Sequence, residues 1–427
     1  MSIHPEQFPA SGPPRARGSA AVPVRAAARR ARLAVLWAQL ALLLLAIVPS
    51  AHAGDAERVK RMHDRLVGVP PDDARLATLI GVLQSQGPVE AALAALEHPV
   101  FYTSTLKNWV TPWTNEEGNV YAPLNDYTAT VIGMIRDDVP FNTVLSADLV
   151  YVGRNGLVPA GYSQSNNLHY EQLESSFVDL SNTNDLIGVR QSTLPASQLS
   201  AGDTAGVLTT RAAGMAYFSA GTNRAMVRFT AMNFLCRDME DLLDTSLPAD
   251  WIRQDVSRSP GGDSSIFMTS CVGCHSGMDP MAGAFAYFEW VPGNPNVAGD
   301  EGRVIHTPGR VQPKYLINAN SFPAGYVTSD NRWENRWVEG RNSVLGWPAA
   351  PREGYGAKGF GQAIGNSDAF ATCQVEKVFE QVCFRPDSSQ ADRDAITQIT
   401  QSFKDNDYSM KRVFAEVAEY CTRADAQ

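Results

Sequence analysis

Two cysteines and a histidine at close spacing are the residues of this sequence best suited to chemistry. Cys271, Cys274 and His275 belong to the run Cys-Val-Gly-Cys-His, in which the thiols are three positions apart and an imidazole follows directly. Thiols at this spacing can add to the two vinyl groups of one porphyrin, and the imidazole can then bind its iron, so CxxCH is the attachment motif of a c-type haem. The sequence therefore predicts one covalent haem c on Cys271 and Cys274, with His275 as the metal ligand.

Three other interpretations of this motif are weaker. A thioredoxin-like CxxC requires a βαβ setting, and the sequence around Cys271 is not strand-like. A zinc site requires a second pair of ligands, and the sequence has no other CxxC and no HxxxH. A disulfide between Cys271 and Cys274 would be strained by so short a loop.

The first 53 residues have the composition of a secretory signal peptide. Six arginines precede the apolar run 33–48, and Pro49 and the triplet Ala51-His52-Ala53 follow it. The run is shorter than the roughly 20 residues of a membrane span, which favours cleavage near Ala53 over an uncleaved anchor. We therefore expect a periplasmic or secreted mature chain without a membrane span. The long leader before the arginines is compatible with a start codon downstream of Met1.

The charge balance argues against one class of partner. The chain has 36 Lys and Arg against 45 Asp and Glu, a net charge of −9, and no basic run beyond residue 32 could follow a phosphate backbone. Cleavage near Ala53 would make the chain still more acidic. We therefore expect no nucleic-acid partner. With 44% hydrophobic and 19% charged residues, the composition is that of a globular chain.

The spacing of apolar residues predicts a mainly α fold. Together with the CxxCH motif, it leads us to expect a cytochrome c-like haem core with large helical and irregular additions. We expect helices over 55–96 with a break at Pro70-Pro71, a polar surface excursion over 161–210 and one long helix over 211–243. The predicted parts are the signal peptide 1–53, a mostly helical region 54–210, the haem-binding segment 211–290, an irregular covering segment with short strands 291–366, and a C-terminal helical segment 367–427 that completes the haem domain.

A helix is also expected directly after the motif. Asp279 can cap it and Pro280 can open it, with Met281, Phe285 and Phe288 on one face. In cytochrome c domains the attachment helix packs against a helix near the chain end. The apolar stripe over 410–421 is available for that contact.

The second axial ligand of the iron is not evident in the sequence. No methionine occurs between residues 282 and 409, which leaves His306, Met410 or no protein ligand as the candidates. Met410 falls on an apolar helical stripe, which is typical of a core residue, and His306 is the only histidine downstream of the motif. A distal ligand would tune the reduction potential, whereas an open position would permit peroxide or oxygen chemistry.

The other methionines are poorer candidates for the distal position. Met278 and Met281 are too close to His275 to reach the opposite face of the haem. Met232 and Met239 fall on the helix predicted over 211–243, where core packing is the default.

The remaining four cysteines are expected to form two disulfides in an oxidising compartment. Cys373 and Cys383 fall on one predicted helix about 15 Å apart, beyond the reach of an S–S bond. This excludes their pairing, and with it the pair Cys236–Cys421. An up-down-up arrangement of the three terminal segments favours Cys236–Cys373 and Cys383–Cys421.

The segment 271–280, Cys-Val-Gly-Cys-His-Ser-Gly-Met-Asp-Pro, is followed by an aromatic stretch ending at Glu289 and resembles the haem segment of the planctomycete-type cytochrome c proteins. Residues 367–375 and 407–410 are similar to the helical segments that close those proteins, and Pro140-Phe141 to an upstream segment. The resemblance implies an exported, haem-binding, redox-type protein. The single CxxCH excludes a multi-haem wire within one subunit.

These observations support three hypotheses of function. The leading one is an exported c-type cytochrome that transfers electrons to or from a redox partner, either a protein or a small-molecule donor or acceptor. The alternative is a haem oxidoreductase of peroxidase or oxygenase type, because the chain is larger than a carrier needs and residues 97–210 or 291–366 could build an open distal site. In the third, the haem only stabilises a structural or binding module.

Overall fold

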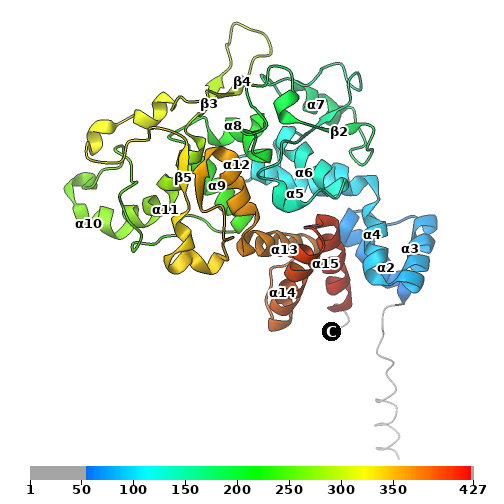
Figure 1. The fold of residues 1–427 in the computed structure, drawn as a ribbon. Coiled ribbons are helices and arrows are strands. Elements are labelled where there is room, and N and C mark those ends of the chain that lie inside the picture. The colour runs from blue at the N-terminus through cyan, green and yellow to red at the C-terminus, as the bar shows by residue number, and fades with distance from the viewer. Residues whose placement is uncertain (1–53, 425–427) are drawn as a thin grey trace, which may run out of the picture. The chain divides into compact units, whose positions relative to one another are not determined.

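Helices dominate the computed structural model, which describes residues 54–424 (Figure 1). The longer helices are α2 (Asp55–Val67), α3 (Asp73–Gln86), α4 (Pro88–Leu96), α6 (Asp126–Arg136), α9 (Arg224–Leu235), α11 (Val272–Ala282), α12 (Gly356–Gly365), α13 (Asp368–Cys383), α14 (Gln390–Asp405) and α15 (Met410–Ala424). The shorter ones are α5 (Lys107–Val110), α7 (Leu168–Ser175), α8 (Arg211–Tyr217) and α10 (Ser264–Ile266). The prediction of a mainly α chain is therefore confirmed. The expected signal peptide, residues 1–53, lies outside the described residues.

The strands of the described chain form three small antiparallel pairs. They are β1 (Val150–Gly153) with β2 (Leu186–Val189), β3 (Phe288–Pro292) with β4 (Gly302–His306), and β5 (Arg332–Glu334) with β6 (Glu353–Tyr355). In the second pair Phe288 is opposite His306. The strands β4, β5 and β6 confirm the short strands expected within 291–366.

Turn residues separate the three helices of residues 55–96. Gly68 ends α2 with φ 80°, a left-handed conformation that glycine adopts without steric cost. The carboxylate of Asp72 then accepts the backbone N–H of Arg75 at 2.8 Å and caps α3. Pro88 stands in the first turn of α4, where its missing N–H breaks no helical hydrogen bond. The predicted break at Pro70-Pro71 lies between α2 and α3.

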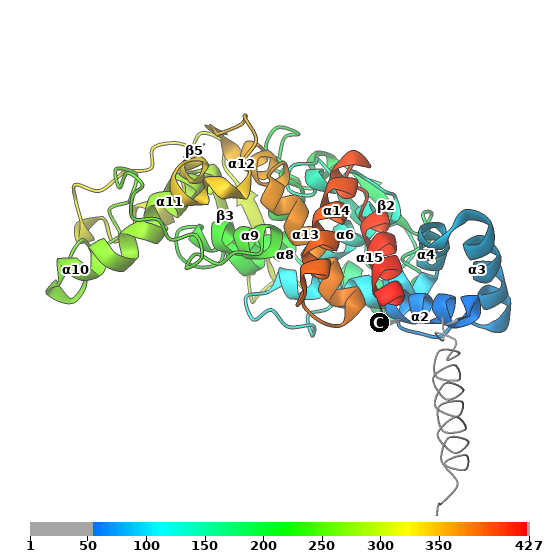
Figure 2. The same cartoon turned by 90° about the horizontal axis from the view of Figure 1, so that it is seen from below.

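The helices at the end of the chain pack on those at its beginning. Both views show α15 between α13 and the pair α2 and α4, and α15 contacts all three (Figures 1 and 2). Phe414, on the buried face of α15, meets the ring of Phe101 at 5.1 Å and that of Trp109 at 5.3 Å. The apolar stripe predicted over 410–421 is therefore real, and it forms core with the N-terminal helices.

One helix of the central region is buried on every side. All residues of α6 are buried, which is the property of a helix at the centre of a core. The carboxylate of Asp126 accepts the backbone N–H groups of Arg211 at 2.6 Å and of Ala212 at 3.0 Å. This contact ties the first turn of α8 to the centre of the molecule.

The polar segment 161–210 contributes more to the core than its composition predicts. Tyr170, Leu186, Val207 and Leu208 are all buried, so the prediction of a surface excursion was wrong for these parts. Many polar residues between them are exposed, but some polar side chains satisfy buried backbone groups. For example, the side-chain amide of Gln191 donates to the carbonyl of Gly206 at 2.7 Å.

The single helix expected over 211–243 is broken. α8 ends at Tyr217 and α9 begins at Arg224, and no helix covers 236–243. Asn223 lies between them in the left-handed region with φ 59°, and its side-chain amide donates to the carbonyls of Phe285 at 2.8 Å and Phe288 at 3.1 Å. These tertiary hydrogen bonds hold the break, so helical periodicity on its own overestimated the length of the helix.

A helix was missed in the segment 291–366. α12 has the sequence GAKGFGQAIG, whose glycines are typical of loops. The structure shows why small residues stand there. A side chain on Gly361 would overlap the carbonyl of Leu145, and one on Gly365 the carbonyl of Asn142. The glycines allow close packing of α12 on the backbone of 142–145.

Candidate functional site

The Cys-Val-Gly-Cys-His motif lies at the start of α11. The helix α10, a π-helical turn at Phe267–Cys271 and α11 follow one another without interruption. The chain is therefore already helical when it reaches Pro280, which lies inside α11. The predicted helix with Asp279 as its cap and Pro280 as its opening residue was wrong. Pro280 has no N–H to donate to the carbonyl of Ser276, and α11 ends two residues later and continues as the 3₁₀ turn Gly283–Phe285.

The aromatic residues after α11 do not continue one helix as expected. Met281 and Phe285 are buried in the core, but Phe288 already belongs to strand β3. Its ring stacks on Phe218 at 5.6 Å, in the connection between α8 and α9. The predicted helical face therefore divides between the end of α11 and a strand pair.

Four side chains of this segment share one helical face. Cys271, Cys274, His275 and Met278 fall within about 100° around the helix axis. The opposite face contains Gly273 and Gly277 and approaches other elements closely. A Cβ on Gly273 would lie 2.6 Å from the Cγ of Leu243, and one on Gly277 would overlap the indole Nε1 of Trp337. The glycine face fixes α11 in the fold, and the other face carries the motif.

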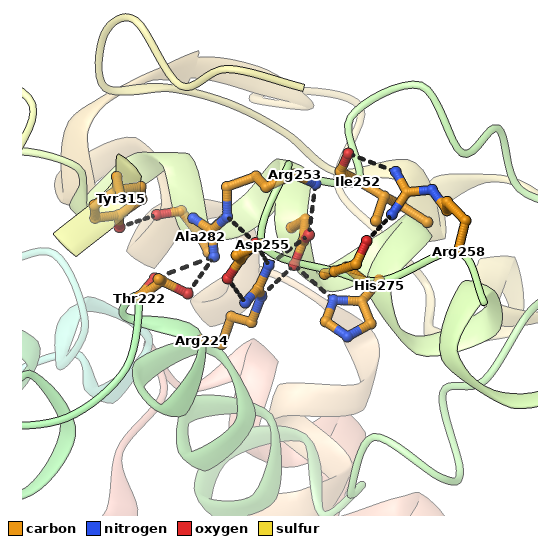
Figure 3. Close-up of polar contacts among 11 residues, drawn as sticks. Thr222, Arg224, Ile252, Arg253, Asp255, Arg258, His275, Ala282 and Tyr315 are labelled. Carbon is orange, nitrogen blue, oxygen red and sulfur yellow. Dashed lines mark hydrogen bonds and ion pairs between the residues drawn. The ribbon is translucent and has the colours of Figure 1, made fainter. Parts of the chain in front are cut away.

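The imidazole of His275 is held by a carboxylate one turn later in α11 (Figure 3). Its Nδ1 lies 3.0 Å from the Oδ1 of Asp279. The Asp279 side chain is fully buried, whereas 20% of the His275 side chain is exposed. An ionised carboxylate only accepts hydrogen bonds, so in the neutral imidazole Nδ1 carries the proton and Nε2 keeps its lone pair. The structure thus orients His275 with Nε2 available to a metal ion.

Arg224, at the start of α9, binds Asp279 and also a second carboxylate, that of Asp255, which Figure 3 labels beside it. Its Nε and Nη2 donate to the two carboxylate oxygens of Asp279 at 2.6 and 2.9 Å. Its Nη1 and Nη2 donate to Asp255 at 2.6 and 2.8 Å. The backbone N–H of Arg253 adds a further donor to Asp279 at 3.1 Å. Charge-assisted pairs with this fork geometry are strong and directional.

These contacts keep the network charged. Burial favours the protonated form of Asp279, but the charges of Arg224 and Arg253 and the hydrogen bonds from His275 and Arg224 outweigh it and lower the pKa of Asp279. Burial also opposes the charge on Arg224, yet Asp279 and Asp255 raise the pKa of its guanidinium above the usual value. The group that accepts the His275 hydrogen bond is therefore a carboxylate at neutral pH.

A second buried arginine joins α9 to the end of α11. Arg253 is 1% exposed, and its Nη2 donates to the hydroxyl of Thr222 at 2.6 Å, just before α9. Its guanidinium lies over the ring of Tyr315 at 4.8 Å, and the Tyr315 hydroxyl donates to the carbonyl of Ala282 at 2.7 Å (Figure 3). Arg253 thus contacts the residues before α9 directly and the end of α11 through Tyr315.

The four cysteines outside the motif form the two predicted disulfides. Cys236 pairs with Cys373, and Cys383 pairs with Cys421, with Cα separations of 5.4 and 5.5 Å. Cys373 and Cys383 both lie on α13, as expected. Both pairings are confirmed.

The two thiols of the motif are free and half-buried. Cys271 packs against the small apolar cluster of Ile252, Val256, Phe267 and Val272. The Sγ of Cys274 lies 3.5 Å from the backbone oxygen of Met239, and burial raises the pKa of this thiol. The free thiols therefore stand at the edge of the core and are not enclosed by it.

An open groove of about 410 Å³ runs beside α9 and reaches the motif face of α11 at Met278. Met239 also lines it, in the loop after α9, and this residue contacts Cys274 through its backbone. The groove is lined by Glu116, Arg224, Ala225, Arg228, Phe229, Met239 and Met278.

Neither downstream candidate for the distal ligand lines this groove. Met410 begins α15, is 2% exposed and belongs to the core against the N-terminal helices. His306 ends β4 and is 5% exposed, and its ring lies tilted against that of Phe288, with the ring centres 4.6 Å apart. The methionines at the groove are Met239 and Met278, of which Met239 lies in a loop and not on the predicted helix.

The expected contact between α11, the attachment helix, and α15 at the end of the chain is not formed, and each helix packs against other elements. α11 packs against α9, β5 and the 3₁₀ turn Arg336–Val338. The stripe of α15 is covered by α4, α13 and the rings of Phe101 and Trp109. The prediction that this stripe packs on the attachment helix was therefore wrong, because the N-terminal helices occupy it.

Comparison of the chain with protein-family models, with curated proteins and with solved structures finds no match. Within residues 54–424, no group of three or more His, Cys, Asp or Glu side chains could hold a metal ion by itself. No helix of this part of the chain has both the length and the apolar character needed to cross a membrane.

The sequence pointed to the motif residues but not to the groups that orient them. The spacing of His275 and Asp279, four positions apart, is a signal that could have been used, because such residues are neighbours on a helix. Arg224 is 55 residues from Asp279 and 31 from Asp255, and no local pattern relates the three. Only the fold brings them together.

Proposed function

We propose that this protein carries one haem c, attached through Cys271 and Cys274 with His275 as an iron ligand, and that it transfers electrons between this haem and a redox partner. The observation that carries the proposal is that the six cysteines fall into two classes, disulfide-bonded and free. The four that lie outside the motif are joined in disulfides, whereas the two of the motif are free and share a helical face with His275. The resemblance of 271–289 to the planctomycete-type cytochrome c proteins supports the same function.

The side chains of this face fit a covalent haem. Cys271 and Cys274 are unbonded thiols within one helical turn, and the hydrogen bond to Asp279 leaves Nε2 of His275 free. The groove opens on the same helical face at Met278, although Cys271, Cys274 and His275 do not line it. When bound, the haem supplies an iron that alternates between the ferric and ferrous states. The chain would attach the haem through the two thiols, orient the imidazole of His275 and shield part of the haem from water.

Export of the chain is part of this proposal. Haem attachment to CxxCH takes place outside the cytoplasm, and two disulfides fit an oxidising compartment. Expression in a bacterial host that has the haem-attachment machinery, followed by separation of periplasm and cytoplasm, tests this point. We expect the mature chain in the periplasm, and a chain that stays in the cytoplasm would contradict export.

The main experiment measures covalent haem. The purified protein should show a mass increase of one haem and a c-type pyridine haemochrome spectrum after denaturation. The double variant Cys271→Ser/Cys274→Ser should lose both signals. A matched control, Cys236→Ser/Cys373→Ser, removes two other cysteines and should keep the haem in the fraction that folds. A wild-type chain without covalent haem under these conditions would disprove the proposal.

A second candidate function, a haem oxidoreductase with an open distal position, is favoured by the groove. The groove adjoins the motif face, and neither His306 nor Met410 lines it. The ferric absorption spectrum separates the two functions. A low-spin iron that is unchanged by cyanide and peroxide supports the electron carrier, whereas a high-spin iron that binds either one supports the oxidoreductase.

A further inference from the structure

We propose that Asp279 is a positioning residue of the haem site, which holds His275 through a charged hydrogen bond and thereby lowers the reduction potential of the iron. This inference rests on the proposed attachment of haem at Cys271, Cys274 and His275. It assigns a role to a residue that the sequence marked only as a helix cap.

The first step of the argument is the acceptor of the Nδ1 proton. Metal-binding histidines donate their second ring N–H to a carboxylate, a backbone carbonyl or water, and the acceptor sets both the tautomer and the basicity of the ligand. Here the acceptor is the Asp279 carboxylate, 3.0 Å from Nδ1. A negatively charged acceptor draws the proton more strongly than a neutral carbonyl. It makes Nε2 a stronger electron donor, which stabilises ferric iron relative to ferrous iron.

The second step is the rigidity of this pair. His275 and Asp279 stand one turn apart on the same helix, so their backbone positions are fixed relative to each other. Asp279 has no exposed side-chain surface, and its oxygens accept from Arg224 and from the backbone of Arg253 as well as from His275. The carboxylate therefore cannot turn away from the imidazole without breaking several hydrogen bonds.

The third step is the charge balance around the carboxylate. Asp279 and Asp255 share Arg224, and the guanidinium of Arg253 lies nearby, with its Nε 4.0 Å from Asp255. Arg258 also interacts electrostatically with both carboxylates, so guanidinium groups surround the pair. Hydrogen bonds from Arg224 and from the backbone of Arg253 hold the carboxylate beside the imidazole of His275.

The test is the midpoint potential of the haem in the variant Asp279→Asn. Asparagine keeps the shape of the side chain and removes its charge. We expect the haem to remain attached and the preference for ferric iron to fall about tenfold, which corresponds to a rise of about 59 mV for a one-electron couple. The ferric electron paramagnetic resonance spectrum should change as well, because the imidazole becomes a weaker donor.

A matched control is Asp392→Asn in α14. Asp392 is also a buried carboxylate paired with an arginine, Arg385, but it belongs to the cap of another helix. Its variant should lose stability and keep the wild-type potential. This control separates a specific effect on the haem from a general weakening of the fold.

The possible results distinguish the two proposals. An Asp279→Asn protein that carries haem at an unchanged potential overturns the inference and leaves the proposed function intact. A wild-type protein without haem overturns the proposed function. If the variant does not fold, proton magnetic resonance of the wild-type ferrous form decides instead. We expect the Nδ1 proton of His275 to be protected from solvent exchange, and a rapidly exchanging proton would overturn the inference.

Discussion

The Nδ1 of His275 and the carboxylate of Asp279 are hydrogen-bonded at 3.0 Å within one turn of α11. The same carboxylate is bound by Arg224 from α9 and by the backbone of Arg253. The imidazole of the CxxCH motif is thus connected to a helix that precedes it by about fifty residues in the chain, and its orientation depends on tertiary structure.

Substitution of the two downstream distal candidates should leave the haem spectrum unchanged. Met410 and His306 are core residues that do not line the groove at the motif. Met410→Leu conserves volume and should cost less than about 1.5 kcal/mol of stability. His306→Ala removes a buried ring that packs against Phe288 and should destabilise the fold further. Absorption spectra of both redox states are the measurement. A shift of the Soret band in either variant would identify that residue as a ligand.

Gly277→Ala should destabilise the protein by about 1–3 kcal/mol, the usual cost of overpacking. The added methyl group would overlap the indole of Trp337, which is fully buried. Gly81→Ala is the matched control, because Gly81 lies in α3 with nothing within 4 Å of the added atom. Alanine should stabilise that helix by roughly 0.5–1 kcal/mol. Urea denaturation of both variants tests the pair of expectations, and equal stabilities would refute the packing argument.

Loss of Cys236–Cys373 should cost more stability than loss of Cys383–Cys421. The first bond closes a loop with a sequence separation of 137 residues and the second one of 38. The loop-entropy relation gives about 5 and about 4 kcal/mol for these loops. The paired serine variants, compared by denaturation under non-reducing conditions, provide the measurement. The reverse order would show that effects other than loop entropy dominate.

Stability should fall as the pH drops from 7.5 to 5.5. Burial lowers the pKa of His63, His98 and His306 in the folded protein. The unfolded chain takes up protons near pH 6.5, whereas the folded chain resists them, so the free energy of unfolding decreases as the pH falls below about 6.5. Denaturation midpoints at the two pH values measure the slope.

His63 should account for part of this pH dependence. Its Nε2 accepts a hydrogen bond from Arg75 at 3.1 Å, and its Nδ1 lies 2.8 Å from the carbonyl of Val69. Protonation of Nε2 would break the first bond and place two positive charges together. His63→Gln removes the titration, so its stability should vary less with pH than that of the wild-type protein. An unchanged slope would exclude His63 as a cause.

The sequence by itself determined the features that depend on local chemistry and periodicity. The spacing of Cys271, Cys274 and His275 defines a motif whose chemistry follows from three side chains. The apolar period predicted the helices at both ends of the chain, and it placed Cys373 and Cys383 on one helix, from which the two disulfides followed. These properties are contained in stretches of a few turns.

Only the tertiary structure decided how these elements meet. The helix predicted over 211–243 is interrupted at Asn223, because the side chain of Asn223 hydrogen-bonds to residues more than sixty positions away. In the structure the N-terminal helices pack on the apolar stripe of α15, so Met410 lies in their core and away from the CxxCH motif. The tertiary structure also changed Asp279 from an expected cap into the partner of His275, because Arg224 is brought to it by the packing of α9 on α11. Contacts between distant segments have no periodic signal in one sequence, and they determine what surrounds the motif.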